Sequence, residues 1–212
     1  MSTNKPKWLQ SDWSFIDLNW EIITEEERLK TIEVVWNLPI SEYIELIIKS
    51  VEESIVTIIA AETWSWKTTQ VPKILSQALK NIKKVTVTEP RVIAAIWAAK
   101  RVAKELIIFT LDELYSIWHK VWYRTWKEKL SSHISELLFV TDALQLLRQF
   151  VSGIQQDILI VDEVHTFSVA TEFLLAMVKR EMEKVKNKIS FDVSYYGYRT
   201  YQGFFYTYKR SK

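Results

Sequence analysis

Short, uninterrupted runs of apolar residues recur along this chain and are separated by stretches with helical spacing. The first run, Ile55 to Ala61, is rich in β-branched residues, and similar runs follow at Leu137 to Thr141 and Ile158 to Val161. Val85 to Thr88, which alternates Val and Thr, is also expected to be a strand. A strand that is apolar on both sides is buried on both faces, which is typical of a parallel sheet covered by helices. The pattern predicts an α/β fold with a doubly wound, mainly parallel sheet and helices on both faces.

Apolar residues at helical spacing link these runs. The stretches that we expect to be helical are Thr24 to Val35, Ile40 to Glu53, Lys67 to Lys80, Arg91 to Leu106, Asp142 to Phe150 and Val169 to Lys186. A further short strand is expected around Val121 to Thr125. We therefore divide the chain into an N-terminal extension (1–35), an α/β domain (36–188) and an atypical aromatic tail (189–212).

The tail differs from the rest of the chain. From Ser190 onward it is rich in Tyr and shows neither helical nor convincing strand periodicity. We interpret it as foreign to the domain, through truncation or a change of reading frame. The alternative is an aromatic and basic segment that binds single-stranded nucleic acid.

Composition narrows the class of protein. With 28 Lys and Arg against 26 Asp and Glu, the formal charge of +2 excludes a chain-wide polybasic mechanism, so nucleic-acid contacts must come from local patches. The absence of Cys excludes disulfides and thiolate metal sites and suits a reducing compartment. No apolar run reaches about 18 residues and the N-terminus lacks a signal-peptide core. We expect a cytoplasmic protein that does not enter membranes.

The first candidate site follows the run Ile55 to Ala61. Glu62-Thr63-Trp64-Ser65-Trp66-Lys67-Thr68 leads from the expected strand into a helix, which is the context of a phosphate-binding P-loop. In such a loop backbone N–H groups surround the phosphates, the Lys reaches the outer phosphate oxygens and the Thr hydroxyl ligates Mg²⁺. Trp64 and Trp66 stand where the pattern requires Gly. A Lys-Thr pair at a helix start is by itself commonplace.

The second candidate site is Asp162-Glu163-Val164-His165, directly after the apolar run Ile158 to Val161. Parallel α/β sheets place their ligand sites at the carboxyl ends of the strands. Asp162 could hold Mg²⁺ and Glu163 could polarise an attacking water. Taken alone, the pair fits a helix cap equally well.

Together with two further segments, these sites resemble a known family. Glu62 to Thr68 looks like the motif Glu-Thr-Gly-X-Gly-Lys-Thr, and Asp162 to His165 looks like a DEAH box with Val for Ala. Thr88 to Arg91 resembles Thr-Gln-Pro-Arg, and Thr141 to Leu144 resembles the start of Thr-Asp-Gly-X-Leu. These motifs, in this order, are those of the first RecA-like domain of DEAH-box ATP-dependent RNA helicases.

The resemblance implies binding of ATP, Mg²⁺ and RNA, and it leaves DNA open as a further partner. The residues implied in ATP binding are Glu62, Thr63, Trp64, Ser65, Trp66, Lys67, Thr68, Thr69 and His165. The residues implied in Mg²⁺ binding are Thr68, Asp162 and Glu163, and those implied in catalysis are Lys67, Asp162 and Glu163. The residues implied on the RNA path are Thr88, Pro90, Arg91, Thr141 and Asp142.

The resemblance also implies that this chain is a fragment. The family's Ser-Ala-Thr motif is absent, as is the second RecA-like domain, which supplies arginine fingers. We therefore expect the chain to be inactive alone. The alternatives are a non-catalytic RNA- or protein-binding fragment with an occluded P-loop and, less favoured by the two RNA motifs, a different P-loop NTPase.

Tryptophan is unusually abundant, with 10 Trp against 3 Gly. Trp64, Trp66, Trp118 and Trp122 all fall on positions that are glycine in the family. Some bacterial lineages read the codon UGA as Gly and others read it as Trp. We hypothesise that several of these Trp are UGA codons translated under the wrong table; the alternative is that the indoles are real and block the phosphate site.

Overall fold

The computed structural model describes residues 25–61, 66–79, 82–110, 120–126, 135–153, 156–166, 168–182, 188–194 and 204–208. The helices are α1 (Glu25–Trp36), α2 (Ile44–Glu53), α3 (Lys67–Ala78), α4 (Val92–Thr110), α5 (Asp142–Ser152) and α6 (Val169–Met182), with short 3-10 helices η2 (Pro39–Tyr43) and η4 (Val164–Thr166). The strands are β1 (Val56–Ala61), β2 (Val85–Glu89), β3 (Val121–Arg124), β4 (Leu137–Thr141), β5 (Ile158–Val161), β6 (Lys188–Ser194) and β7 (Phe204–Tyr208).

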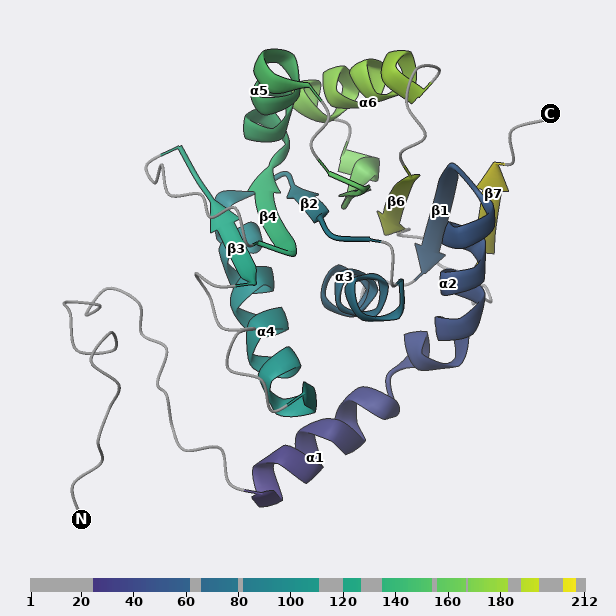
Figure 1. Ribbon diagram of the computed structural model, residues 1–212, viewed down its shortest axis with the longest axis vertical. Helices are drawn as coiled ribbons and strands as arrows, with labels where there is room; N and C mark the ends of the chain where they lie inside the picture. Colours follow the sequence, from purple (N-terminus) through teal and green to yellow (C-terminus); the bar gives the residue numbers. More distant parts are fainter. Residues whose placement is uncertain are drawn as a thin grey trace.

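The described strands form one sheet in the order β3-β4-β2-β5-β6-β1-β7 (Figure 1). All neighbouring strands pair in parallel except β7, which runs antiparallel to β1 at one edge. Among the described residues, α3 lies between β1 and β2, α4 between β2 and β3, α5 between β4 and β5, and α6 between β5 and β6. The predicted α/β class and the doubly wound, mainly parallel sheet are confirmed.

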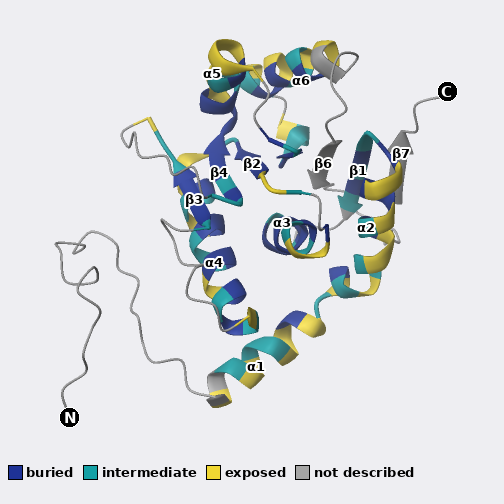
Figure 2. Ribbon diagram, viewed as in Figure 1, coloured by how far each residue is buried: buried dark blue, intermediate teal, exposed yellow. Residues whose placement is uncertain are grey.

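Both faces of the sheet are covered, as β5 shows most directly. Ile158 and Ile160 belong to the large buried cluster formed with α2, α3 and α4, whereas Leu159 and Val161 pack with α6. Successive side chains of a strand point to opposite faces, so a strand that is apolar at every position needs partners on both. Figure 2 shows the resulting buried positions along the central strands and the exposed outer positions of α5 and α6.

Small side chains bring α4 close to the sheet. Ala95, Ala98 and Ala99 are fully buried, and Val102 continues the same buried stripe one turn later. At the far end of α4, Arg28 of α1 donates a hydrogen bond from its Nε to the carbonyl of Ile108 at 3.1 Å. The N-terminal helix therefore packs against the domain. None of the described helices is long and apolar enough to cross a bilayer.

The expected helices and strands are found with small shifts at their ends. The expected helix from Ile40 begins as a 3-10 turn, because Pro39 occupies its first position and Leu38 before it is extended. The helix from Asp142 ends at Ser152, where Gly153 adopts a φ of 71° and donates its N–H to the carbonyl of Gln149. The expected end of the last helix at Lys186 lies outside the described residues.

Two strands lie in the part of the chain where the sequence shows no convincing strand periodicity. Lys188–Ser194 forms β6, which pairs in parallel with both β5 and β1. Phe204–Tyr208 forms β7 on the other side of β1. In β6, the apolar residues Ile189, Phe191 and Val193 alternate with polar ones, and the aromatic residues of β7 are typical of strands. The sheet thus extends beyond the expected domain boundary at residue 188.

Candidate functional site

The carboxyl ends of β1, β2, β4 and β5 emerge at the same edge of the sheet, because these strands run in parallel. The candidate motifs follow directly from these ends: the expected P-loop after β1, Pro90 and Arg91 after β2, Asp142 after β4 and Asp162 after β5. Topology alone therefore brings the four motifs to one side of the molecule.

The N-terminus of α3 carries the Lys67-Thr68 pair of the expected P-loop. Lys67 is the first helical residue and is only 3% exposed, while Thr69 behind it is fully buried. No side chain caps this helix end. The first backbone N–H groups of a helix have no intrahelical partner and attract anions such as phosphate. Glu62, Thr63, Trp64 and Ser65, expected to complete the loop, lie outside the described residues.

The two halves of the candidate site meet through Thr68 and Asp162. The Thr68 hydroxyl donates a hydrogen bond to Asp162 Oδ2, which joins the P-loop helix to the end of β5 across 94 residues of sequence. Asp162 is 1% exposed, and its other oxygen, Oδ1, accepts the N–H of Glu163 at 2.7 Å. A hydroxyl and a carboxylate side by side are oxygen donors of the kind that Mg²⁺ prefers when phosphates supply further ligands. These residues therefore fit a Mg²⁺–nucleotide complex.

The backbone turns sharply directly after Asp162. Glu163 has a φ of 48°, and with Trp66 it is one of two non-glycine residues with positive φ among the described residues. Non-glycine residues in this region store strain and cluster at functional sites. The Glu163 side chain is partly exposed at the site's edge.

Two further polar contacts lie at the carboxyl ends of the strands: one joins the ends of β5 and β2, and the other joins Asp142, which follows β4, to α6. Asp162 donates its backbone N–H to the carbonyl of Thr88 at 3.0 Å. Asp142 is buried at the start of α5, and its Oδ2 accepts the hydroxyl of Thr171 in α6 at 2.5 Å. Thr171 also contacts Ser168, whose Oγ accepts the Thr171 N–H at 3.1 Å as the helix begins. Sequence analysis did not identify Ser168 and Thr171.

Burial raises the pKa of the Asp142 carboxyl above its ordinary value. The Thr171 hydrogen bond and the nearby Thr88 hydroxyl oppose this rise, and the charge of Asp162 adds to it. The Thr88 hydroxyl nevertheless makes no hydrogen bond of ordinary geometry, and neither does Asp142 Oδ1. The charge of Asp162, at the end of β5, is therefore one of the influences that raise the pKa of Asp142.

The remaining candidate residues differ in accessibility. Arg91 is exposed and Pro90 is partly exposed, whereas Thr88 is 0% exposed and Thr141 is buried. In this structure only Arg91 and Pro90 of that group present side chains to a ligand at the surface. His165 lies in η4, partly exposed, with its Nδ1 buried and without a hydrogen-bond partner.

Trp66 adopts a backbone conformation that suits glycine. Its φ of 61° and ψ of 28° place it in the left-handed region directly before α3. A bulky L-residue pays roughly 1–2 kcal/mol there, because its Cβ crowds the following carbonyl. The indole lies against α4, with its ring centroid 6.5 Å from that of Trp97 and 5.2 Å from the guanidinium carbon of Arg101. These contacts offset part of the strain.

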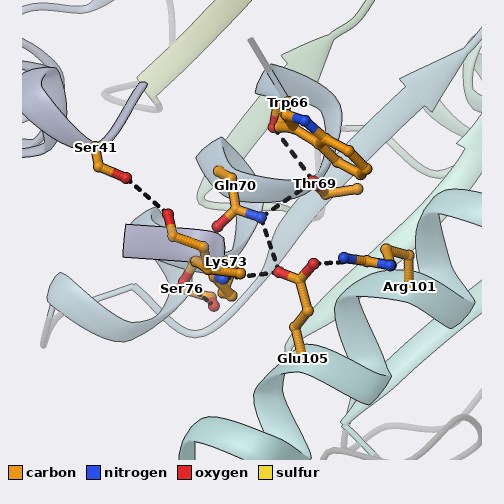
Figure 3. Close-up of polar contacts among 9 residues, drawn as sticks. Ser41, Trp66, Thr69, Gln70, Lys73, Ser76, Arg101 and Glu105 are labelled. Atoms are coloured by element: carbon orange, nitrogen blue, oxygen red, sulfur yellow. Dashed lines mark hydrogen bonds and ion pairs between the residues drawn. The ribbon is translucent and has the colours of Figure 1, made fainter. Parts of the chain in front are cut away.

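A buried polar cluster behind the site joins α3 to α4 (Figure 3). Glu105 of α4, 1% exposed, accepts hydrogen bonds from Gln70 and Lys73 on Oε2, each at 2.8 Å, and from Arg101 on Oε1 at 2.7 Å. Sequence analysis missed this cluster. A signal was present, because Glu105 follows the buried Ala98 and Val102 at helical spacing and so lies on the buried face of α4.

Two opposing influences act on the pKa of Glu105. Burial acts to raise it and is the largest single influence, but Lys73, Gln70 and Arg101 together outweigh burial and leave the pKa below its ordinary value. A carboxylate with several donors is stabilised in its ionised form. Glu105 is therefore charged at neutral pH.

Comparison with known proteins supports the resemblance. Over 157 residues the chain is 34% identical to the Arabidopsis thaliana pre-mRNA-splicing factor ATP-dependent RNA helicase DEAH10, covering 72% of this chain and 21% of that protein. Over 147 residues it is 31% identical to the ATP-dependent RNA helicase HrpA of Borreliella burgdorferi, covering 68% of this chain and 17% of that protein. No protein-family model matches the chain. The chain is thus similar to DEAH-box ATP-dependent RNA helicases and spans about a fifth of their length.

The left-handed conformation of Trp66 generates a prediction. Trp66→Gly and Trp66→Ala remove the same indole contacts, but Ala keeps a Cβ at positive φ, so we expect the Gly variant to be more stable by about 1 kcal/mol. At the exposed Trp97 inside α4 the order reverses, and Ala is favoured over Gly by about 1 kcal/mol. Free energies of unfolding from urea titration of the four variants test this. Equal or greater stability of Trp66→Ala would contradict it.

Proposed function

We propose that this chain is the ATP-binding domain of a DEAH-type ATP-dependent RNA helicase, in which ATP hydrolysis drives unwinding of nucleic acid. The contact between Thr68 and Asp162 carries the proposal, because it joins two motifs that are far apart in sequence. A Lys-Thr helix start and an acidic strand end are each commonplace. Their direct contact at the carboxyl edge of a parallel sheet is typical of a nucleoside triphosphatase.

The residues of the site divide the work of triphosphate binding. Lys67 and the N-terminus of α3 would bind phosphate oxygens, and Thr68 and Asp162 would hold Mg²⁺, which would neutralise charge on the phosphates. Glu163 lies next to the metal-holding carboxylate and orients the attacking water. We assign to His165, in η4, the coupling of the ATP site to neighbouring motifs, as the family resemblance implies. Burial of Lys67 and Asp162 excludes water and strengthens these electrostatic interactions.

We place RNA at the edge of the site formed by the ends of β2 and β4. Arg91 is the exposed cation there and binds the RNA backbone. The other residues implied on the RNA path are buried, and we propose that they stabilise the backbone at this edge without contacting RNA; they are Thr88, Thr141 and Asp142. We propose that DNA can bind in place of RNA only if no part of the complete protein forms a hydrogen bond with the 2′-hydroxyl group of the RNA.

A second RecA-like domain would be needed for turnover. The relatives are about five times longer than the matched region. The family resemblance implies that a second RecA-like domain supplies the arginine fingers. We propose that the complete enzyme is cytoplasmic, and that the 212 residues alone bind ligands but do not turn over ATP.

The second candidate function is a non-catalytic RNA- or protein-binding fragment. Trp66 favours it, because a bulky residue stands where a phosphate-binding loop requires close approach of the backbone. Trp64, in the loop outside the described residues, adds a second indole. If both indoles are present in the cell, the phosphate site is blocked and only the fold remains.

We propose instead that glycine is native at positions 64 and 66. The left-handed backbone at Trp66 supports this, since the chain there has kept the conformation that glycine adopts freely. Trp122 stands on another position that is glycine in the family. It is buried in β3 and does not have a positive φ, so its backbone conformation does not require glycine.

The proposal about glycine makes a direct prediction. The gene should carry UGA at codons 64 and 66, and the intact mass of protein isolated from its natural host should be lower than that of the written sequence by the difference between Trp and Gly at each recoded site. UGG at these two codons would overturn it.

Nucleotide binding separates the two candidate functions. We expect the chain with Trp64→Gly and Trp66→Gly to bind Mg²⁺-ATP in isothermal titration, and the written chain not to bind. Adding Lys67→Ala to the glycine form should weaken binding by about 10–100-fold, because a charged hydrogen bond to phosphate is lost. Neither form should hydrolyse ATP appreciably. RNA-stimulated turnover by the isolated chain would contradict the need for a second domain.

RNA binding has its own prediction. Arg91→Ala should weaken binding of single-stranded RNA and lower the slope of log affinity against log salt by about one, because one phosphate contact is lost. Arg180→Ala, an exposed site on α6, is the control and should leave the slope unchanged. Fluorescence anisotropy over a salt series measures both, and an equal effect of the two substitutions would contradict the assignment.

A further inference from the structure

The buried cluster around Glu105 lies outside the candidate site, yet it is connected to it. Gln70, which donates to Glu105, also donates to the hydroxyl of Thr69 at 3.3 Å. Thr69 in turn donates that hydroxyl to the carbonyl of Trp66 at 3.2 Å. Figure 3 shows this line of contacts running from α4 to the residue that precedes α3.

The line ends at the first turn of α3, between the residues that the proposed function uses. The carbonyl of Trp66 accepts hydrogen bonds from the N–H groups of Thr69 and Gln70, so it is fixed by three donors. Lys67 and Thr68 lie within this turn. The direction of their side chains therefore depends on how the turn is held.

Lys73 belongs to the cluster but not to this line. Its ammonium binds Glu105 at 2.8 Å and lies 4.6 Å from the centroid of the Phe109 ring. These contacts tie the second turn of α3 to the end of α4. Lys73 thus stabilises the packing of the two helices without reaching Trp66 or Thr69 through any of these contacts.

We infer that Glu105 is a positioning residue for nucleotide binding: through Gln70 and Thr69 it holds the first turn of α3, and so sets the placement of Lys67 and Thr68. This inference rests on the proposed function. The position of Glu105 on α4 adds a consequence, because α4 begins directly after Arg91. One buried carboxylate then anchors both the phosphate-binding helix and the helix that follows the RNA-binding segment.

A purely structural role for Glu105 makes a different prediction, and Lys73 separates the two. Glu105→Gln keeps the size of the side chain but removes its charge, and Gln70→Leu cuts the line to Thr69. Lys73→Met removes an ion pair from the same cluster and leaves the line intact. If the cluster only stabilises the fold, all three substitutions lower the thermal midpoint and none changes affinity for nucleotide while the protein is folded.

The test uses the full chain with glycine at positions 64 and 66 as the parent. Mg²⁺-ATP affinity is measured by isothermal titration well below the thermal midpoint of each variant. We expect Glu105→Gln and Gln70→Leu each to weaken binding by about tenfold, as removal of supporting partners around a ligand site typically does. Their double variant should bind no more weakly than the weaker of the two single variants, because both substitutions act on one line of contacts. Lys73→Met should bind as the parent does.

The outcomes are distinct. Parent-like binding by Glu105→Gln, or equal weakening by Lys73→Met, overturns the positioning role and leaves the proposed function intact. Failure of the parent itself to bind Mg²⁺-ATP overturns the proposed function and this inference with it. Weakening confined to Glu105→Gln, Gln70→Leu and their double variant supports it.

Discussion

The parallel pairing of the central strands is the constraint on which the rest of this structure depends. Because β1, β2, β4 and β5 run the same way, every loop that leaves their carboxyl ends lies on one edge of the sheet. Burial on both faces keeps these strands in place, since β5 alone contributes side chains to the clusters on either side. Motifs that are tens of residues apart thereby become neighbours without any long insertion.

Polar contacts then refine what the sheet brings together. Thr68 and Asp162 join the first helix after β1 to the end of β5, and Asp142 and Thr171 join α5 to α6. Glu105 performs the same task behind the site, between α3 and α4. Each link uses a buried carboxylate, which holds its donors firmly because an unpaired charge in that environment is costly. Polar contacts on both faces of the sheet therefore hold the helices next to its carboxyl edge in place.

Much of this arrangement is predictable from the sequence, for physical reasons that differ by element. The strands β4 and β5 have the expected bounds, because a run that is apolar at every position has few other ways to be buried. The strand β6 was not expected, because the Tyr-rich segment after it concealed the alternation of Ile189, Phe191 and Val193. The contact between Thr68 and Asp162 is expected from the order of the motifs. The polar cluster around Glu105 depends on which helices touch, and only the folded sheet decides that. The conformation of Trp66 likewise shows only in three dimensions.

The place of β6 in the sheet has a consequence for the order in which the molecule can assemble. Among the described strands, β1 pairs only with β6 and β7, which are made more than 120 residues later. While the ribosome is still adding the intervening segments, β2, β4 and β5 can already associate, but β1, the strand before α3, has no neighbouring strand with which to pair. Such long-range pairing slows folding and leaves an apolar strand exposed in the meantime. The sheet edge that carries Lys67, Thr68 and Asp162 is thus among the last parts of the nascent chain to take shape.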